Sequence, residues 1–122
     1  MKNAINWFEI PVRDFDRAKK FYETILNYQM KTQEFGSDKL GFLPSDREAL
    51  GGAIYHGESY KPSNDGVVIY INGNPDLAEI EKRIEPAGGK VVLSKRQISP
   101  EIGYMAIFID SEGNRIALHS NK

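Results

Sequence analysis

Apolar residues near the start of the chain first alternate with other residues and then recur at helical spacing. Every second residue from Phe8 to Val12 is apolar, which is typical of a strand with one buried face. Between Phe15 and Ile25 the apolar positions lie three or four residues apart, and Asp14 precedes them as a suitable N-cap. The chain is therefore predicted to begin with a strand over 4–12 and a helix that ends at Leu26.

The next part of the chain carries three short apolar pieces separated by turn-forming residues. These pieces lie at 28–30, 40–43 and 53–55, and they predict three strands in a meander. Residues 57–66 are rich in Gly, Ser, Pro, Asn and Asp, so we expect a linker there, almost at the midpoint of the chain.

The second half repeats this order. A strand over 67–71 is followed by a helix with Asn74 as N-cap and Pro75 at its first position, and then by strands over 90–93, 104–109 and 115–119. A shift of 59 residues places six apolar positions on six others: Phe8 on Val67, Ile10 on Ile69, Val12 on Ile71, Ala18 on Leu77, Phe21 on Ile80 and Ile25 on Ile84. We therefore predict an α+β domain over 1–122, built from two tandem βαβββ modules at 1–57 and 66–122 with a linker at 58–65.

Composition narrows the classes of function. The chain has 122 residues, which suits one domain, and a formal net charge of −1, which does not favour nucleic acid or an anionic membrane as a partner. It contains no cysteine, so a metal would have to be held by His, Asp or Glu. Neither a signal peptide nor an apolar segment of membrane-spanning length is present, and we expect a cytoplasmic protein.

The two ends of the chain carry motifs that resemble those of a known family. The opening motif spans 7–18 and continues with Phe21 and Tyr22, and the closing motif spans 110–119 and contains Asp-Ser-Glu-Gly-Asn. Together with the paired modules, these motifs resemble the vicinal oxygen chelate (VOC) superfamily, which includes glyoxalase I, bleomycin resistance proteins and extradiol dioxygenases. The resemblance implies a curved, eight-stranded open-barrel cup, often completed in a homodimer.

In metalloenzymes of that superfamily the cup holds a divalent cation bound by His and Glu side chains. The matching positions in this chain are Trp7, Gly66, Ala117 and a position near Ala53 or Ile54. None of these residues offers a side chain that binds a divalent cation well. We therefore expect no resident metal or other cofactor, with a weak divalent metal at a shifted site as the alternative.

Polar residues on the same strands are candidates for the site. Strand alternation places Trp7 and Glu9, and likewise Arg115 and His119, on the faces opposite the apolar ones. Glu9 and His119 could form an acid/base pair, or a shifted metal site together with His56. The competing interpretation is that Glu9 is paired with Arg115 or with the backbone and that His119 lies in solvent near the C-terminus.

The orientation of His56 depends on how the last strands of the two modules correspond. A shift of 63 residues matches His56 to His119, whereas a shift of 64 matches Ala53 to Ala117 and turns Tyr55 into the cup. A slip of one residue reverses the face of a strand, so both registers stay open at this stage.

Aromatic side chains at strand positions could line a pocket for a small organic molecule, with Arg115 orienting the ligand. These residues are Trp7, Phe42, Tyr55, Tyr70, Tyr104 and Phe108. The favoured hypothesis is a small-molecule-binding protein of the glyoxalase/bleomycin resistance type that forms a homodimer. The alternatives are a glyoxalase-related lyase or isomerase that uses Glu9 and His119, and a regulatory module whose cup is an oligomer interface.

Overall fold

Residues 7–56 form the first βαβββ module of the protein. The computed structural model describes residues 3–122. The elements of the first module are β1 (Trp7–Pro11), α1 (Phe15–Leu26), β2 (Thr32–Phe35), β3 (Asp38–Phe42) and β4 (Gly51–His56). The segment between Gly57 and Ile69 then leads to the second module.

The second module repeats the same order of elements. It consists of β5 (Tyr70–Asn72), α2 (Ala78–Ile84), β6 (Lys90–Ser99), β7 (Gly103–Ile109) and β8 (Arg115–Ser120). Each module contributes one four-stranded sheet, in the orders β1-β4-β3-β2 and β5-β8-β7-β6. In both sheets the first and last strands of the module pair in parallel, and the other pairs are antiparallel. The predicted α+β fold with two βαβββ modules is confirmed.

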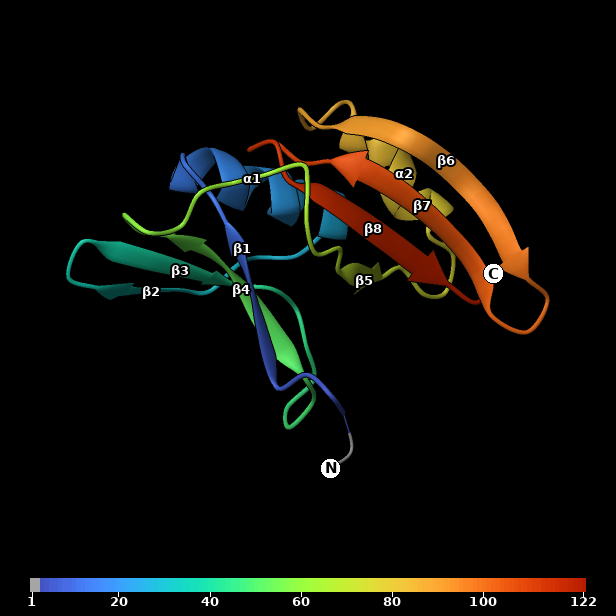
Figure 1. Ribbon diagram of the computed structural model, residues 1–122, viewed down its shortest axis with the longest axis horizontal. Coiled ribbons are helices and arrows are strands. Elements are labelled where there is room, and N and C mark those ends of the chain that lie inside the picture. Colours follow the sequence, from blue (N-terminus) through green and yellow to red (C-terminus); the bar gives the residue numbers. More distant parts are fainter. Residues whose placement is uncertain (1–2) are drawn as a thin grey trace.

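The eight strands are divided between two open sheets that share no strand pairing among the described residues. Figure 1 shows the two sheets side by side, with β1 and β4 crossing the centre of the view and β5 to β8 on the right. On each sheet one face packs against helices, and we call the opposite face the outer face. Strand alternation places Trp7, Glu9 and Tyr55 on the outer face of the first sheet and Arg115 and His119 on that of the second.

One of the two predicted helix N-caps is confirmed and the other is wrong. Asp14 caps α1 as expected, because its side chain accepts a hydrogen bond from the backbone N–H of Arg17. The predicted start at Asn74 is wrong, since α2 begins only at Ala78. The backbone N–H of Leu77 donates to the buried hydroxyl of Ser120, which ties the approach to α2 to the last strand.

Helix α1 joins the modules into one hydrophobic core. Its Phe21 ring packs against Phe108 of β7, with ring centroids 6.1 Å apart. It also contacts α2, whose Arg83 donates to the backbone carbonyl of Ile25. Because residues of both modules belong to the same buried cluster, neither module has a separate core.

Two adjacent glycines in β4 make room for two adjacent aromatic rings in β1. A Cβ at Gly52 would lie 2.3 Å from the nearest ring atom of Phe8, and a Cβ at Gly51 would lie 3.2 Å from the ring of Trp7. Phe8 points toward the helices and Trp7 toward the outer face, so the pair of glycines lets one strand carry a large ring on each side.

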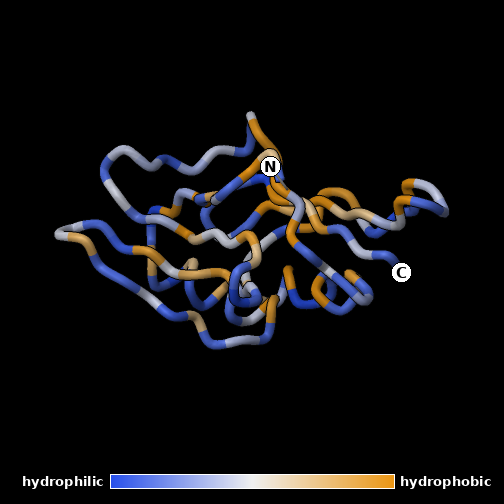
Figure 2. Tube along the Cα trace, turned by 90° about the horizontal axis from the view of Figure 1, so that it is seen from below, coloured by the Kyte–Doolittle hydropathy of each residue, from blue (hydrophilic) through white to orange (hydrophobic). Residues whose placement is uncertain are grey.

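The hydropathy of the chain follows this arrangement. Figure 2 shows most of the hydrophobic stretches toward the middle of the trace, while the outlying loops are mostly hydrophilic or neutral. No helix within residues 3–122 is long and apolar enough to cross a membrane.

Candidate functional site

A cavity lies between β1, the segment that links the modules, and the start of β8. Its volume is about 220 Å³. Glu9 and Pro11 line it from β1, and Arg115 and Ile116 line it from β8. The remaining lining residues are Ile10, Lys61, Ser63, Asp65, Val67, Ile69 and Asn114. Both modules therefore contribute to one site, at the point where their first and last strands approach each other.

Four charged side chains line this cavity, two of each sign. They are Glu9, Lys61, Asp65 and Arg115. The ion pairs among residues 3–122 include none of the four, so no carboxylate in the cavity is within 4 Å of a cationic nitrogen. The expected ion pair between Glu9 and Arg115 is not formed.

The Arg115 guanidinium is only partly used by the protein. One of its terminal nitrogens donates a 2.9 Å hydrogen bond to the carbonyl of Gly66. Its Nε is buried and has no hydrogen-bond partner among the residues from Asn3 onward. A guanidinium presents five N–H donors, so Arg115 keeps donors for an additional acceptor.

Two donors fix the Glu9 carboxylate. The hydroxyl of Tyr60 donates to Oε1 at 2.8 Å, and the indole N–H of Trp7 lies 3.3 Å from Oε2. Tyr60 comes from the linking segment and its ring stacks on that of Tyr55, with centroids 3.8 Å apart. Glu9 thus lies between two aromatic pairs, Trp7–Phe42 and Tyr55–Tyr60, and bonds to one ring of each; we call these four residues the aromatic cluster.

The phenols of this cluster stay protonated far above neutral pH. The hydrogen bond to Glu9 raises the pKa of Tyr60. The hydrogen bond from Tyr55 to Asp38, together with partial burial, raises the pKa of Tyr55 to about 12. Both hydroxyls therefore act as fixed donors toward carboxylates rather than as bases.

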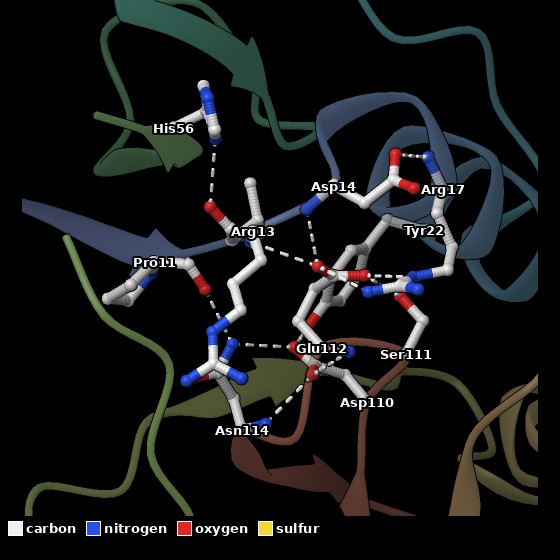
Figure 3. A network of polar contacts seen from close by, with 11 residues as sticks. Pro11, Arg13, Asp14, Arg17, Tyr22, His56, Asp110, Ser111, Glu112 and Asn114 are labelled. Carbon is white, nitrogen blue, oxygen red and sulfur yellow. Dashed lines mark hydrogen bonds and ion pairs between the residues drawn. The ribbon is translucent and has the colours of Figure 1, made fainter. Parts of the chain in front are cut away.

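Backbone and amide hydrogen bonds hold the walls of the cavity together. The side chain of Asn114 donates to the carbonyl of Pro11 at 2.7 Å and accepts from the backbone N–H of Ser63. The backbone N–H of Arg115 in turn donates to the carbonyl of Ser63. Figure 3 shows Asn114 between Pro11 of β1 and the turn that contains Asp110. One buried asparagine thus fixes β1, the linking segment and β8 relative to one another.

The closing motif forms a buried acidic network behind this wall. The Glu112 carboxylate accepts hydrogen bonds from the backbone N–H groups of Arg13 and Asp14 and from the Arg17 guanidinium. Burial by itself raises the pKa of Glu112, but the hydrogen bonds from Arg17 and the backbone outweigh it, so that the pKa lies below its usual range. Asp110 accepts a 2.6 Å hydrogen bond from the Tyr22 hydroxyl. The motif therefore joins the second module to the start of α1.

Three of the predicted ligand-binding aromatics lie together, although none of them lines the cavity. Trp7, Phe42 and Tyr55 belong to the aromatic cluster around Glu9. Tyr70 lies on the second sheet, where its side chain is largely exposed. Of the residues predicted to bind a ligand, Arg115 is the one that lines the same cavity as Glu9.

The two aromatic residues of β7 point toward the helices and away from the outer face. Phe108 is fully buried in the core, and Tyr104 packs against that core beneath the ammonium group of Lys95. Tyr104 and Phe108 lie four residues apart and so share one face of the strand, but alternation alone does not say which side of a sheet a helix covers.

His56 lies on the helix-covered face of the first sheet, and His119 lies on the outer face of the second. The ring of His56 contacts the carbonyl of Val12, whereas His119 contacts the carbonyl of Ile102 at 2.6 Å from Nε2. Of the two possible correspondences between the last strands of the modules, the structure agrees with the shift of 64 residues. Tyr55 lies on the outer face, and His56 points away from it.

Glu9 and His119 are not brought together as an acid/base pair. His119 does not line the cavity that contains Glu9, and its Nε2 is engaged by a backbone carbonyl. Within residues 3–122 no three His, Asp or Glu side chains are grouped so that they could hold a metal ion. The shifted metal site of Glu9, His56 and His119 is therefore not formed in this structure.

Sequence reasoning missed the part of the site that comes from the linking segment. Lys61, Ser63 and Asp65 line the cavity, and Tyr60 fixes Glu9. The segment is rich in turn formers, which predict only a linker. Tyr60 was the available signal, because a large aromatic ring in a polar segment indicates a contact with the folded domain.

Comparisons with known proteins agree with the fold. The model of the Glyoxalase/Bleomycin resistance protein/Dioxygenase superfamily matches residues 4–118. A glyoxalase/bleomycin resistance protein from Albidiferax ferrireducens T118 has 16% identity and a TM-score of 0.77 over 98% of this chain and 100% of its own. The fosfomycin resistance protein FosX from Listeria monocytogenes has 19% identity and a TM-score of 0.65, over 100% of this chain and 94% of its own.

A glyoxalase I mutant from Zea mays has 16% identity and a TM-score of 0.71 over 97% of this chain, which spans 45% of that protein. No match to the chain was found among curated proteins. At these identities the solved structures support the fold and carry no information about a shared ligand.

Proposed function

The chain belongs to the glyoxalase/bleomycin resistance protein/dioxygenase superfamily, and on that premise we propose that it binds a small organic molecule in the cavity between β1 and β8. The observation that carries the proposal is the placement of Glu9 and Arg115 in one cavity without an ion pair between them. Partly buried charges are costly to leave without a counter-charge, and a bound ligand can supply one.

The way in which Glu9 is held supports this proposal. Its carboxylate accepts hydrogen bonds from Tyr60 and Trp7, which restrict its orientation. A carboxylate has about four acceptor positions, so two donors leave capacity for a ligand. A group that is oriented before binding loses less conformational entropy when the ligand arrives.

The donor set around the site does not fit a resident divalent cation. Trp7, Ala53 and Ala117 stand at or near the positions where the superfamily resemblance would place ligands, and none of them offers a carboxylate or an imidazole. A catalytic metal requires at least three such donors converging on it. We therefore derive no metal-dependent step for this chain and favour ligand binding.

An acid/base enzyme that uses Glu9 and His119 is less well supported. A general acid and a general base must both reach the reacting atoms directly or through one water. His119 is bonded to the carbonyl of Ile102 and does not line the cavity. Because His119 is engaged elsewhere, Glu9 supports the orientation of a ligand better than it supports acid/base catalysis with that histidine.

A screen for ligands by thermal shift tests the proposal. We expect at least one small polar metabolite to raise the unfolding midpoint of the protein, and the Glu9→Gln and Arg115→Met variants to lose that response. The controls are Glu101→Gln and Arg96→Met, which change exposed residues that do not line the cavity. A library without any hit, or hits that respond equally in all four variants, would contradict the proposal.

The proposal includes a homodimer that covers the outer faces of the sheets. Trp7, Phe35 and Tyr70 are large, are 43–54% exposed, and belong to strands of the two open sheets. Exposed apolar residues on open sheets favour association. Light scattering coupled to size exclusion should give twice the 13.8 kDa mass of one chain, and a monomer at micromolar concentration would contradict this part of the proposal.

A further inference from the structure

We infer that the ligand of this cavity is a small zwitterion, with a cationic group that binds Glu9 and an anionic group that binds Arg115. This inference rests on the proposed function and names the class of ligand.

The charges in the cavity cancel. Glu9 and Asp65 are balanced by Lys61 and Arg115, and none of the four makes an ion pair within 4 Å in the part of the chain that the structure describes. Lys61 and Asp65 are exposed, whereas Glu9 and Arg115 are partly buried. A ligand with a single charge would satisfy one inner group and leave the other without a counter-charge. A ligand that carries both charges satisfies both groups at once.

The anionic half of the ligand is inferred from Arg115. Its Nε is buried without an acceptor, and it is the one buried side-chain nitrogen or oxygen within residues 3–122 that lacks a hydrogen-bond partner. Buried polar atoms in native proteins nearly always have partners, so an orphaned donor on a residue that lines the cavity indicates a missing acceptor. A carboxylate suits this position because it can accept two parallel hydrogen bonds from a guanidinium.

The cationic half is inferred from Glu9 and its aromatic neighbours. Among residues 3–122 the carboxylate accepts hydrogen bonds from the neutral donors of Tyr60 and Trp7 and from no charged donor. An ammonium group would supply the missing positive charge and donate a charge-assisted hydrogen bond to the carboxylate. A neutral ligand would not supply that charge.

The size of the cavity limits the ligand. Sites for drug-sized molecules have volumes of roughly 300–1,000 Å³, and this cavity has about 220 Å³. A short amino acid or a betaine is therefore a better match than a large antibiotic or a peptide.

Isothermal titration with compounds of graded charge separation tests the inference. The zwitterions are glycine, β-alanine, 4-aminobutanoate, 6-aminohexanoate and glycine betaine, and the single-charge controls are propylamine and propanoate. We expect at least one zwitterion to bind at least tenfold more tightly than either control. Tenfold weaker binding of that zwitterion is expected for Glu9→Gln and for Arg115→Met, which corresponds to about 1.4 kcal/mol each.

Matched variants separate the loss of the site from the loss of the fold. Arg115→Lys keeps the positive charge but removes the Nε donor, so it should retain more affinity than Arg115→Met. Glu101→Gln and Arg96→Met should bind like the unchanged protein. Circular dichroism must show a native spectrum for every variant that is compared, and Lys61→Met, at an exposed position, provides a second test of the cationic side if Arg115→Met fails to fold.

The outcomes distinguish the ligand class from the proposed function. If propylamine, propanoate or a neutral compound such as butanamide binds as tightly as every zwitterion, the inference is overturned while the binding function stands. If the zwitterions fail and a thermal-shift hit from another chemical class depends on Glu9, the inference is again overturned alone. If no compound of any class binds, both the inference and the proposed function are overturned.

Discussion

The hydroxyl of Tyr60 donates a 2.8 Å hydrogen bond to Oε1 of Glu9. This contact joins the segment between the two modules to the first strand of the chain, 51 residues earlier. It orients a carboxylate at the edge of the cavity that both modules share. The structural role of Tyr60 therefore depends on Glu9, and the orientation of Glu9 depends on Tyr60.

The first prediction concerns the pKa of Tyr60. The hydrogen bond to Glu9 stabilises the protonated phenol and raises its pKa. Glu9→Gln removes the negative charge, so the pKa of Tyr60 should fall toward about 10, the ordinary value for tyrosine. Tyrosine labelled at Cζ with ¹³C allows this titration to be followed by NMR. Glu101→Gln serves as the control, and an unchanged Tyr60 titration in Glu9→Gln would show that the contact is not formed in solution.

The second prediction concerns acid stability. The pKa of Glu112 is lower in the folded state than in the unfolded state, so its contribution to the free energy of unfolding is present above about pH 4.3 and is lost as the pH falls through the folded pKa. Glu112→Gln should lower the free energy of unfolding by about 2 kcal/mol at pH 7. Below pH 5 the free energy of unfolding of this variant should fall less steeply with pH than that of the unchanged protein. Urea unfolding at several pH values measures both effects. If the free energy of unfolding of Glu112→Gln falls just as steeply below pH 5, the stabilising role of Glu112 is contradicted. Glu58→Gln, at an exposed position, is the control.

The third prediction concerns the buried hydroxyl of Tyr22. It donates to Asp110 at 2.6 Å, and Asp110 also accepts from the backbone N–H groups of Glu112 and Asn114. Tyr22→Phe keeps the ring in the core but removes one charge-assisted hydrogen bond, which should lower the free energy of unfolding by about 2 kcal/mol. Denaturant unfolding measures the change. Tyr70→Phe, at an exposed site, should change stability by less than about 0.5 kcal/mol.

Much of the fold follows from local signals in the sequence. Phe8 and Ile10, which alternate along the first strand, and Ile25, at the end of the helical spacing, all lie in or against the core. This is what the strand and helix periods predict. The start of α2 could not be read in this way, because Leu77 is held by a hydrogen bond to Ser120, 43 residues later. A proline next to an asparagine is an adequate local signal, but it does not outweigh a long-range contact of this kind.

The site was less predictable than the fold for a similar reason. Strand parity correctly placed Glu9 on the outer face and Arg115 in the cavity wall. It could not show that Phe108 points into the core, since that depends on where α1 packs. Nor could it show that Tyr60 returns to Glu9, because the path of an irregular segment is set by tertiary contacts and has no period.

The fourth prediction concerns the two glycines of β4. A Cβ at Gly52 would overlap the buried side of the Phe8 ring, whereas a Cβ at Gly51 would meet the exposed Trp7 ring at 3.2 Å. Gly52→Ala should therefore destabilise the protein by about 1–3 kcal/mol, and Gly51→Ala should cost less because the Trp7 side chain can move. Thermal or urea unfolding of both variants gives the order. The reverse order would contradict the described packing of β1 on β4.

The fifth prediction concerns divalent metals. Residues 3–122 contain no group of three side chains suited to a metal ion, so Zn²⁺, Mn²⁺ and Ni²⁺ at stoichiometric concentration should not raise the unfolding midpoint. Elemental analysis after dialysis against each metal provides an independent measurement. Retention of one metal per chain, lost in Glu9→Gln or His119→Ala, would revive the shifted metal site.

The central claim is that the cavity between β1 and β8 binds a small organic ligand. Backbone amide shifts from NMR, recorded during titration with the tightest zwitterion, test this claim most directly. We predict that the largest shifts occur at Glu9, Ser63 and Arg115, which line the cavity, with little change at His119. Saturable shifts centred on His119 and the outer face of the second sheet, with Glu9 and Arg115 unaffected, would contradict the account.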